Sequence, residues 1–586
     1  MSIHRRVRKI HRRDQRIPDA LQNAALHPVL KRIYANRQVS SLAQIDYTLD
    51  RLINYKELKG IDTAANILAD AILRREKILV VGDYDADGAT STALVVRALN
   101  SFGSDRVDYL VPNRFEYGYG LTPEIVAVAT DYAPDVLITV DNGISSIEGV
   151  NAAHEQGIRV VVTDHHLPGA ELPGADAIVN PNQPGCGFAS KSIAGVGVAF
   201  YLMLAVRAAL RDRAWFDGSR AEPNMAELLD LVALGTVADV VPLDDNNRIL
   251  VEQGIRRMRA GKTRVGIRAL FDAAGKDIRA CTSTDLGFFI GPRLNAAGRL
   301  EDMSAGVECL ITDDAGVAGT IATELNNLNT QRKQIEQGML GQALEEMETL
   351  LQALEGEQLH AGLCLYNPHW HQGVIGLLAS RIKERFHRPV VAFANASDDA
   401  GSSELKGSAR SIRGLHIRDV LDSIATRHPG LIQKFGGHAM AAGLSIERDR
   451  FEAFRQAFEQ EVDSLLSADA LEEVVETDGS IGPEQMSLET AELIESAGPW
   501  GQQFPEPVFD NCFRIVDWKI VGEKHLKMQL LHDEGDKTID AIAFNTLADD
   551  LPSLQKIHVA YRMNVNEFRN NRNLQLIVDC MSADEQ

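Results

Sequence analysis

The sequence predicts a multidomain α/β fold: a parallel-sheet domain, a long connecting helix, a second α/β domain and a C-terminal β-barrel of the oligonucleotide-binding (OB) type. Three observations support this prediction. Between residues 61 and 245, apolar runs that end in acidic residues alternate with helical patterns, as parallel strands require. A long Gln- and Glu-rich helical pattern comes later in the chain. Five short alternating segments close the sequence.

The bulk composition is that of an ordinary globular protein. At 586 residues the chain is too long for one hydrophobic core. Its formal net charge of −22 argues against coating of a polyanion, although a local basic groove would still bind nucleic acid. The six cysteines form no close pairs, so neither a zinc site nor a disulfide framework is expected, which fits a reducing cytosol.

Residues 1–60 are expected to form a small helical lead-in. The first residues are basic and no apolar segment follows them, so a secretory signal is not expected. This basic segment fits either an arm that contacts phosphates or a solvated tail. The most apolar helical segment, around residues 195–210, is interrupted by Arg207 and is too short to span a bilayer.

The domain expected over residues 61–245 is organised around its first strand. The apolar run 77–81 ends in Gly82 and in three carboxylates on alternating residues, Asp83, Asp85 and Asp87. Ligands of open α/β sheets bind at the carboxyl ends of the strands, and carboxylates this close repel one another unless a cation neutralises them. The stretch therefore predicts a metal site, although a single acid after a strand is often just the N-cap of the next helix.

Two further strands end in the same way. The run 135–140 leads into Asp141, and the run 158–163 leads into Asp164, His165 and His166. Each ending alone fits a helix cap or a core histidine. Because parallel strands end at one edge of a sheet, the three endings together favour a shared metal site.

Asp239 is a further candidate ligand. It lies near the end of an apolar helical run, residues 228–242, where a carboxylate needs a partner. A metal ion, a helix N-cap and a buried arginine all satisfy this need. The combined donors are carboxylates and imidazoles without thiolates, which suit Mn²⁺ or Mg²⁺. They are too many for one ion, so two divalent cations are expected, with Asp141 the candidate bridge, as in enzymes that hydrolyse phosphoesters.

A connecting region is expected over residues 246–355. Residues 291–300 contain two arginines and an asparagine among small residues, which suits either a loop that contacts a phosphate backbone or an ordinary loop with solvated arginines. The polar pattern from about 315 to 355 predicts a long helix between two lobes.

The second α/β domain is expected over residues 356–465 and has three loops of interest, residues 367–373, 406–411 and 435–443. Glycines allow close backbone approach, and consecutive N–H groups bind phosphates; a tight turn is the alternative for the Gly-Gly-His sequence.

The last domain, 466–586, has five predicted strands with basic residues on or between them. Trp518 and Phe568 are placed to stack on bases, whereas a β-domain used for protein contacts is the alternative.

Taken together, these motifs resemble those of the DHH phosphoesterases. The resemblance rests on residues 82–88, 141–143, 164–166 and 235–239, and on residues 436–443 as the signature of the associated second domain. Within this family, the chain resembles the bacterial single-strand-specific exonucleases in three features: Tyr84 in the first motif, the connecting helix and the terminal barrel. The resemblance covers nearly the whole chain.

The resemblance implies roles for individual residues. Asp85, Asp87, Asp141, His165 and Asp239 would bind the two cations, with Asp83 as an additional ligand, and His166 would face the scissile phosphate. Asp141, His165, His166 and Asp239 form the implied catalytic group. The residues implied to bind the strand or its 5′ end are Arg114, Asn295, Arg299, Ser408, Arg410, Gly436, Gly437 and His438. Ala409 departs from the pattern, because glycine is expected there.

The implied activity is metal-dependent hydrolysis of single-stranded DNA from its 5′ end to 5′-mononucleotides, in recombination and in mismatch or base-excision repair. The implied partners are single-strand-binding protein and a helicase that supplies the strand, for a monomer in the bacterial cytoplasm, near the nucleoid and without membrane contact. One rival is a family member that cleaves pyrophosphate, short oligonucleotides or cyclic dinucleotides, which would not need the terminal barrel. Another is a non-catalytic DNA-binding relative, which would be expected to lack ligands that are present here.

Overall fold

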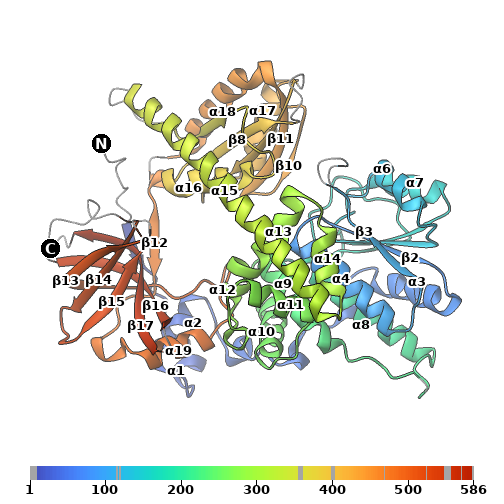
Figure 1. The fold of residues 1–586 in the computed structure, drawn as a ribbon, viewed down its shortest axis with the longest axis horizontal. Coiled ribbons are helices and arrows are strands. Elements are labelled where there is room, and N and C mark those ends of the chain that lie inside the picture. The colour runs from blue at the N-terminus through green and yellow to red at the C-terminus, as the bar shows by residue number, and fades with distance from the viewer. Residues whose placement is uncertain are drawn as a thin grey trace. The chain divides into compact units, whose positions relative to one another are not determined.

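The computed structural model divides into two compact units (Figure 1). Unit 1 comprises Met1–Arg13, Thr330–Met486 and Val508–Gln586, and unit 2 comprises Asp14–Asn329 and Ser487–Pro507. The structure describes residues 9–113, 117, 120–218, 220–353, 360–396, 403–467, 469–522, 524–544, 546, 556–568 and 571–583. The predicted multidomain α/β architecture is confirmed, and each unit is described by itself.

Unit 2 contains a parallel five-stranded sheet with the order β3-β2-β4-β5-β6. Its strands are β2 (Ile78–Gly82), β3 (Val107–Leu110), β4 (Val136–Val140), β5 (Arg159–Thr163) and β6 (Ala177–Val179). The three predicted strands are β2, β4 and β5, which lie at the centre and are almost entirely buried. Their continuous apolar runs are typical of strands covered on both faces. The edge strand β6 is short and lies in a proline-rich stretch, between Pro173 and Pro181.

Helices cover both faces of this sheet. On one face, α6 (Pro123–Thr130) and α7 (Ile147–Glu155) pack against alternate strand residues such as Leu79 and Val81. On the other face, α4 (Ala86–Ser101) packs on β2 and β4, and α8 (Gly195–Asp212) packs on β4 and β5. Helix α8 is apolar on most sides and is buried along most of its length.

The remaining elements of unit 2 are mainly helical. They are α1 (Asp19–Gln22), α2 (Pro28–Asn36), α3 (Ile61–Arg74), α9 (Leu229–Ala238), α10 (Asp245–Arg259), α11 (Val265–Ala273), α12 (Ser283–Asp285), a π-helical turn (Leu286–Ile290), α13 (Gly291–Leu300), α14 (Ser304–Ile311) and α19 (Leu488–Ser496). The prediction of a loop over residues 291–300 was wrong. Pro292 is tolerated in the first turn of a helix, where its missing N–H costs nothing.

The predicted long helix is confirmed as α15 (Ala315–Ala353), which begins in unit 2 and continues into unit 1. In unit 1 it packs beside α16 (Ile375–Phe386). Arg381 Nε donates to Glu336 Oε1 at 2.9 Å, and Trp370 Nε1 donates to Gln342 Oε1 at 3.0 Å. These contacts attach the second half of α15 to the second α/β domain.

That second domain has a mixed sheet with the order β10-β11-β9-β8-β7, in which only β7 and β8 are parallel. Its elements are β7 (Leu363–Tyr366), β8 (Val390–Asn395), β9 (Glu404–Arg410), β10 (Lys434–Gly437), β11 (Ala441–Glu447), α17 (Ile417–Arg427) and α18 (Phe451–Leu465). Helices α17 and α18 share a hydrophobic core with one face of the sheet. Residues 406–411 were predicted as a loop, but most of them belong to strand β9. The side chains of β9 alternate between buried and half-buried positions, as is usual along a strand.

The N-terminal residues that the structure describes form a strand. Strand β1 (Lys9–Arg12) pairs in parallel with β12 (Val474–Thr477). Arg12 binds Asp510, and Arg13 Nη2 donates to Glu476 Oε2 at 3.1 Å. Residues 9–13 therefore form neither the predicted phosphate-contacting arm nor the predicted solvated tail. The parallel partner lies more than 460 residues away in sequence, so no local pattern could predict it.

The five predicted C-terminal strands form a closed barrel in unit 1. They are β13 (Phe509–Val521), β14 (His525–His532), β15 (Thr538–Ala543), β16 (Lys556–Phe568) and β17 (Asn571–Ala583). The strand order is β13-β14-β15-β17-β16, with β15 and β17 parallel. Five strands in a Greek-key barrel are typical of OB domains. Trp518 is 45% exposed, whereas the side chain of Phe568 lies outside the described part of the chain.

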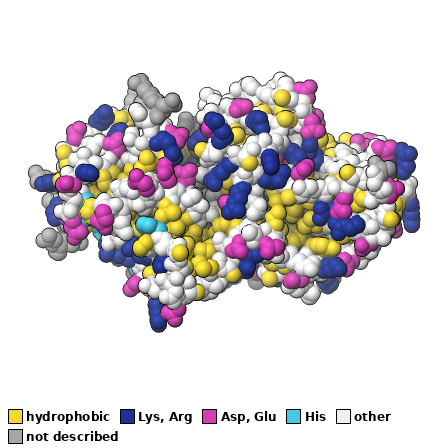
Figure 2. Space-filling view, turned by 90° about the horizontal axis from the view of Figure 1, so that it is seen from below, with side chains coloured by type: hydrophobic (Ala, Val, Ile, Leu, Met, Phe, Trp, Pro, Cys, Tyr) yellow, Lys and Arg dark blue, Asp and Glu magenta, His cyan; other side chains and the backbone are white. Residues whose placement is uncertain are grey.

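The surface carries charges of both signs. On the face shown in Figure 2, Lys and Arg side chains are interspersed with Asp and Glu. Among the described residues, no helix combines the length and the apolar character that crossing a membrane requires.

Candidate metal centre

The candidate metal centre lies where the central strands of the unit 2 sheet end. Gly82 of β2 pairs with Val140 of β4, and Val140 pairs with Thr163 of β5. The residues that follow these three positions are Asp83, Asp141 and Asp164. The strand register therefore brings the three predicted acidic endings to one edge of the sheet.

The turn after β2 presents two of the carboxylates. Asp85 is the N-cap of α4, and its Oδ1 accepts hydrogen bonds from the N–H groups of Asp87 at 2.9 Å and Gly88 at 3.0 Å. A Cβ atom at Gly88 would lie 2.4 Å from the carbonyl oxygen of Asp83, so the turn requires glycine there. The N-cap interpretation of this acid is thus correct for one oxygen of Asp85, and the second oxygen is available to another partner.

Asp141 adopts a backbone conformation that is unusual for a residue with a side chain. Its φ is +63°, and its side chain is almost fully buried. Asn142 fixes the turn, because its Nδ2 donates to the carbonyl oxygens of Val140 at 2.9 Å and Val81 at 3.2 Å. A left-handed conformation costs of order 1 kcal/mol or more and is found mainly where the surrounding structure enforces it. Here it turns Asp141 out of the strand and toward the other acids.

Asp239 comes from a different element, the C-terminal end of α9. It is the C-cap residue, and the following Val240 has a φ of +60° although it is β-branched. Its Oδ2 lies 3.5 Å from His165 Nε2. Asp239 is not an N-cap, and among the described residues no buried arginine pairs with it. It instead approaches His165, which follows the third predicted strand.

The predicted ligand atoms converge in space. His165 Nε2 is 3.1 Å from Asp141 Oδ1. Three sets of ligand atoms each lie within 4.8 Å of one another: Asp141, His165 and His166; Asp87, His165 and Asp239; and Asp83, Asp85 and Asp141. Asp141 and His165 each belong to two of these sets. Overlapping sets of oxygen and imidazole donors fit two divalent cations that share ligands.

Electrostatic repulsion within the cluster is strong. Burial, together with the charge of Asp85, raises the pKa of Asp87 to about 7. Burial and the neighbouring carboxylates raise the pKa values of Asp141 and Asp239 well above the usual range. Carboxylates that resist ionisation in the absence of a cation are those that a bound cation would stabilise most. The donor set and its charge therefore fit Mn²⁺ or Mg²⁺.

Asp87 has a second neighbour that its sequence motif does not reveal, the N-terminus of α8. Gly195 N donates to Asp87 Oδ2 at 2.7 Å, and Val196 N donates to Oδ1 at 2.9 Å. A Cβ atom at Gly195 would lie 2.5 Å from Asp141 Oδ1, and one at Gly235 would lie 2.9 Å from Asp87 Oδ1. The helix N-terminus favours the negative charge, and the two glycines leave space for both carboxylates.

Asp164 holds the histidine pair in place. It is fully buried, and its carboxylate accepts hydrogen bonds from Ile144 N, His165 N and His166 N. Its Oδ1 also lies 2.7 Å from His166 Nδ1. Burial alone would lower the pKa of His166, but the bond to Asp164 and the charges of Asp239 and Asp83 raise it to about 9. Asp164 was predicted only as part of a triplet, and its orienting role is visible only in the structure.

Helix α13 contributes one predicted residue to the neighbourhood of the cluster. Asn295 Oδ1 accepts a hydrogen bond from Ala86 N at 2.8 Å, in the turn between Asp85 and Asp87. Arg299 lies in the last turn of the same helix. Arg114, implied by the resemblance to hold the 5′ end, lies outside the described residues.

Ser408 and Arg410 lie together in unit 1 on β9. Arg410 Nη1 donates to Ser408 Oγ at 3.1 Å, and its Nε donates to Ser380 Oγ at 3.2 Å. Burial lowers the pKa of Arg410, and no carboxylate in the described part of the chain pairs with it. A Cβ atom at Gly376, near the start of α16, would lie 2.8 Å from Arg410 Nη2. A guanidinium beside two hydroxyls and a helix N-terminus is suited to bind an anion.

The departure at Ala409 has a simple explanation. Ala409 is fully buried and belongs to the hydrophobic core shared with α17 and α18. Side chains alternate along a strand, so Ala409 points away from the face of Ser408 and Arg410. A methyl group there leaves the anion-binding face unchanged.

Gly436, Gly437 and His438 form the end of strand β10 and the turn into β11. His438 N donates to the carbonyl oxygen of Ala441 at 2.8 Å. Gly437 has a φ of +142°, and a Cβ atom there would lie 2.4 Å from that same oxygen. The tight-turn interpretation therefore describes the backbone of this motif.

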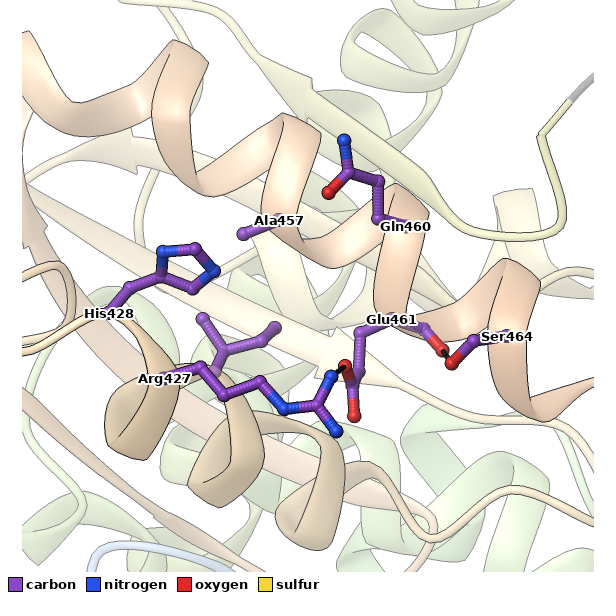
Figure 3. Close-up of a pocket in the computed structure, with 7 residues that line it drawn as sticks. Arg427, His428, Ala457, Gln460, Glu461 and Ser464 are labelled. Atoms are coloured by element: carbon purple, nitrogen blue, oxygen red, sulfur yellow. Dashed lines mark hydrogen bonds and ion pairs between the residues drawn. The ribbon is translucent and has the colours of Figure 1, made fainter.

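A small pocket in unit 1 does not belong to these groups (Figure 3). It lies between α17 and α18. Its only carboxylate, that of Glu461, accepts hydrogen bonds from Arg427 at 2.6 Å and Ser423 at 2.7 Å. Both oxygens are therefore satisfied within the protein, and we assign no function to this pocket.

Comparisons with known proteins agree with this geometry. Family models match three segments: "DHH family, N-terminal domain" over residues 77–236, "DHHA1 domain" over 359–464 and "RecJ OB domain" over 477–579. The single-stranded-DNA-specific exonuclease RecJ of Dickeya dadantii is 52% identical over 582 residues, which cover 99% of both chains. The chain belongs to the RecJ family.

Other RecJ relatives extend the comparison. The RecJ of Escherichia coli is 54% identical over 561 residues, covering 95% of this chain and 96% of that protein. The crystal structure of RecJ from Thermus thermophilus in complex with Mn²⁺ is similar with a TM-score of 0.78 and 29% identity, covering 97% of this chain and 78% of that one. Its complex with Mg²⁺ has a TM-score of 0.72. RecJ relatives thus bind the two ions that the donor set favours.

Proposed function

We propose that this chain is a divalent-cation-dependent exonuclease that hydrolyses single-stranded DNA from its 5′ end to 5′-mononucleotides, in recombination and repair. The observation that carries the proposal is the convergence of the acidic and histidine residues at the end of the unit 2 sheet. Membership of the RecJ family, whose named members are single-stranded-DNA-specific exonucleases, supports the substrate.

The proposed ligands are Asp83, Asp85, Asp87, Asp141, His165 and Asp239. Asp141 and His165 each belong to two of the three donor sets, so these two residues would be the ones available to both cations. When bound, the cations supply positive charge that activates water and stabilises charge developing on the phosphate. The N-terminus of α8 orients Asp87 through two N–H groups, and the backbone turn at Asp141 directs its carboxylate to the same point.

His166 is proposed to face the scissile phosphate. The interaction of its Nδ1 with Asp164 fixes the ring and raises the pKa of the imidazole. A cationic imidazole held in one orientation would pair with a phosphate oxygen and stabilise the negative charge of the transition state.

The anion site formed by Ser408 and Arg410 is proposed to bind the terminal 5′ phosphate. Its support is the half-buried guanidinium of Arg410, which donates to the hydroxyls of Ser408 and Ser380 and to the carbonyl oxygen of Ala409 rather than to a described carboxylate. Arg410→Ala is expected to weaken binding of a 5′-phosphorylated strand about tenfold to a hundredfold, and the matched control Arg413→Ala, on the same segment but exposed and paired with Glu476, should leave it unchanged. Equal binding of phosphorylated and unphosphorylated strands by the parent protein would contradict this role.

Further residues and partners complete the proposal. Asn295, Arg299, Gly436, Gly437 and His438 are proposed to contact the strand, and Arg114 is proposed to bind its 5′ end. The barrel with Trp518 is proposed to hold the strand further along. Single-strand-binding protein and a strand-supplying helicase are the proposed partners of a monomer in the bacterial cytoplasm near the nucleoid. The family resemblance supports these assignments.

Product analysis tests the function directly. A 5′-labelled single-stranded oligonucleotide is incubated with Mn²⁺ or EDTA, beside its duplex and a 3′-labelled copy. Early release of labelled mononucleotide from the 5′-labelled single strand, blocked by EDTA, is the expected result. Survival of long DNA together with cleavage of dinucleotides or pyrophosphate would favour an enzyme for small substrates.

A further inference from the structure

Helix α13 contacts the turn that carries the first metal-binding motif. Asn295 Oδ1 accepts a hydrogen bond from Ala86 N at 2.8 Å. One turn further along the helix, a Cβ atom at Gly298 would lie 1.9 Å from the carbonyl oxygen of Tyr84. Both contacted backbone groups lie between Asp83 and Asp87, so the helix backbone packs directly on this turn.

The other end of the same helix contacts the element that carries Asp239. A Cβ atom at Gly291 would lie 3.0 Å from Ala238 Cβ, and one at Gly287, in the preceding π-helical turn, would lie 3.3 Å from Val237 Cγ1. Ala238 directly precedes Asp239. Helix α13 and the π-helical turn before it therefore pack against two segments that bring carboxylates into the cluster. These segments are the turn after β2 and the C-terminal end of α9.

The hydrogen bond from Ala86 has no obvious substitute. Asp85 Oδ1 accepts from the N–H groups of Asp87 and Gly88, which leaves the N–H of Ala86 to Asn295. Ala86 is 1% exposed, so water has little access to replace the amide. Because the partner is an N–H donor, the side-chain atom that faces it must be the amide oxygen of Asn295. Loss of this acceptor would leave a buried donor unsatisfied and free the turn to move.

We propose that α13 is a positioning element of the metal centre and that Asn295 is a positioning residue, which acts on Asp85 and Asp87 through the Ala86 amide. The inference rests on the proposed function for the identity of the cations. It differs from a contact to the DNA strand, because it predicts weaker cation binding before any DNA is present. Loss of groups that orient metal ligands typically lowers metal affinity 10- to 100-fold.

Calorimetric titration with Mn²⁺ in the absence of DNA tests the proposal. Asn295→Ala is expected to bind Mn²⁺ about 10- to 100-fold more weakly than the parent protein. Asn295→Asp keeps an oxygen acceptor at the same place, so its affinity should return to within about threefold of the parent value. If Asn295 served only as a strand contact, both variants would bind Mn²⁺ normally and Asn295→Asp would bind DNA most weakly. That result would overturn the proposal.

A glycine pair provides a second test that removes no hydrogen bond. Gly298→Ala should weaken Mn²⁺ binding, because the new methyl group would displace the Tyr84 carbonyl. Gly319→Ala is the matched control: Gly319 also lies inside a helix, α15, and apart from its chain neighbours and the nearby backbone of its own helix, no described heavy atom lies within 4 Å of its added Cβ. Thermal unfolding in EDTA establishes that each variant is folded. Parental Mn²⁺ affinity in a folded Gly298→Ala variant would contradict the proposal even if Asn295→Ala failed to fold.

Exonuclease assays at two Mn²⁺ concentrations separate this inference from the proposed function. At saturating Mn²⁺, Gly298→Ala should recover most of its hydrolysis rate, whereas at low Mn²⁺ it should lag behind the parent protein. If the parent protein released no nucleotides from single-stranded DNA, the proposed function would fail. The Mn²⁺ titrations would still decide the role of α13.

Discussion

Asp141 in unit 2 and Asp510 in unit 1 are both buried carboxylates at the end of a β-strand, and their surroundings are opposite. Asp141 faces Asp83, Asp85, Asp87 and Asp239, and burial together with their charges raises its pKa. Asp510 is bound by Arg12 Nη2 at 2.6 Å, by His558 Nε2 at 2.8 Å and by the hydroxyl of Thr477.

Burial would raise the pKa of Asp510 as well, but its bonds from His558, Arg12 and Thr477 hold it well below the usual range. These partners come from β16, β1 and β12, so Asp510 ties the N-terminal strand to the barrel. The comparison teaches that a buried acid which the protein satisfies by itself is structural. A buried acid surrounded by other acids needs a cation from solution, and this is the mark of a functional site.

The sharpest test of this contrast is Asp141→Ala. It should lower hydrolysis of single-stranded DNA by roughly a thousandfold or more, because it removes the ligand shared by two donor sets. Its thermal midpoint in EDTA should equal or exceed that of the parent protein, because a repelled charge is lost. Retained nuclease activity would break the metal assignment, and a large loss of stability would place Asp141 in the same class as Asp510.

Asp510→Asn should have the opposite effect. Removing a charge that Arg12 neutralises, and that His558 and Thr477 contact by hydrogen bonds, should lower the free energy of unfolding by about 3 kcal/mol. Metal-dependent hydrolysis should persist at temperatures where the variant is folded. Denaturant unfolding and the nuclease assay measure the two quantities side by side. A variant that is fully stable but inactive would reverse the comparison.

Removal of metal ions sharpens the contrast further. Mn²⁺ at about 100 times its dissociation constant should stabilise the folded protein by about 2.7 kcal/mol. The same gain is expected in Asp510→Asn, whereas Asp141→Ala should lose most of it. Thermal unfolding with Mn²⁺ and with EDTA measures the difference. An equal Mn²⁺ effect in all three proteins would show that the ion binds elsewhere.

The pH dependence of stability gives the smallest expected effect. The pKa of Asp510 is lowered by folding, so its stabilisation is fully present above the unfolded value of about 4. It is lost as the pH falls through the lower folded value. The difference in unfolding free energy between the parent protein and Asp510→Asn should shrink as the pH falls below about 4. A difference that grew on acidification would exclude this origin.

Much of the candidate site could be predicted because its signal is local. The acids at 83, 85, 87 and 141 directly follow apolar runs, and parallel strands must end at one edge. Gly195 donates its backbone N–H to Asp87, and Asn295 accepts a hydrogen bond from the backbone N–H of Ala86. Neither contact could be predicted, because the partners are more than 50 positions apart in the sequence. The helix over residues 291–300 was missed because its small and basic residues lack a clear apolar period.

The sequence by itself determined the strand endings, the ligand types, the long helix and the five barrel strands, because each depends on the order of neighbouring side chains. Only the tertiary structure decided which buried acids are neutralised from within. Asp510 looks in sequence like any acid in a strand, and its partners Arg12 and His558 are 498 and 48 residues away. The pKa of a buried carboxylate depends on the charges within a few ångströms, and those distances are set by the packing of elements far apart in the chain.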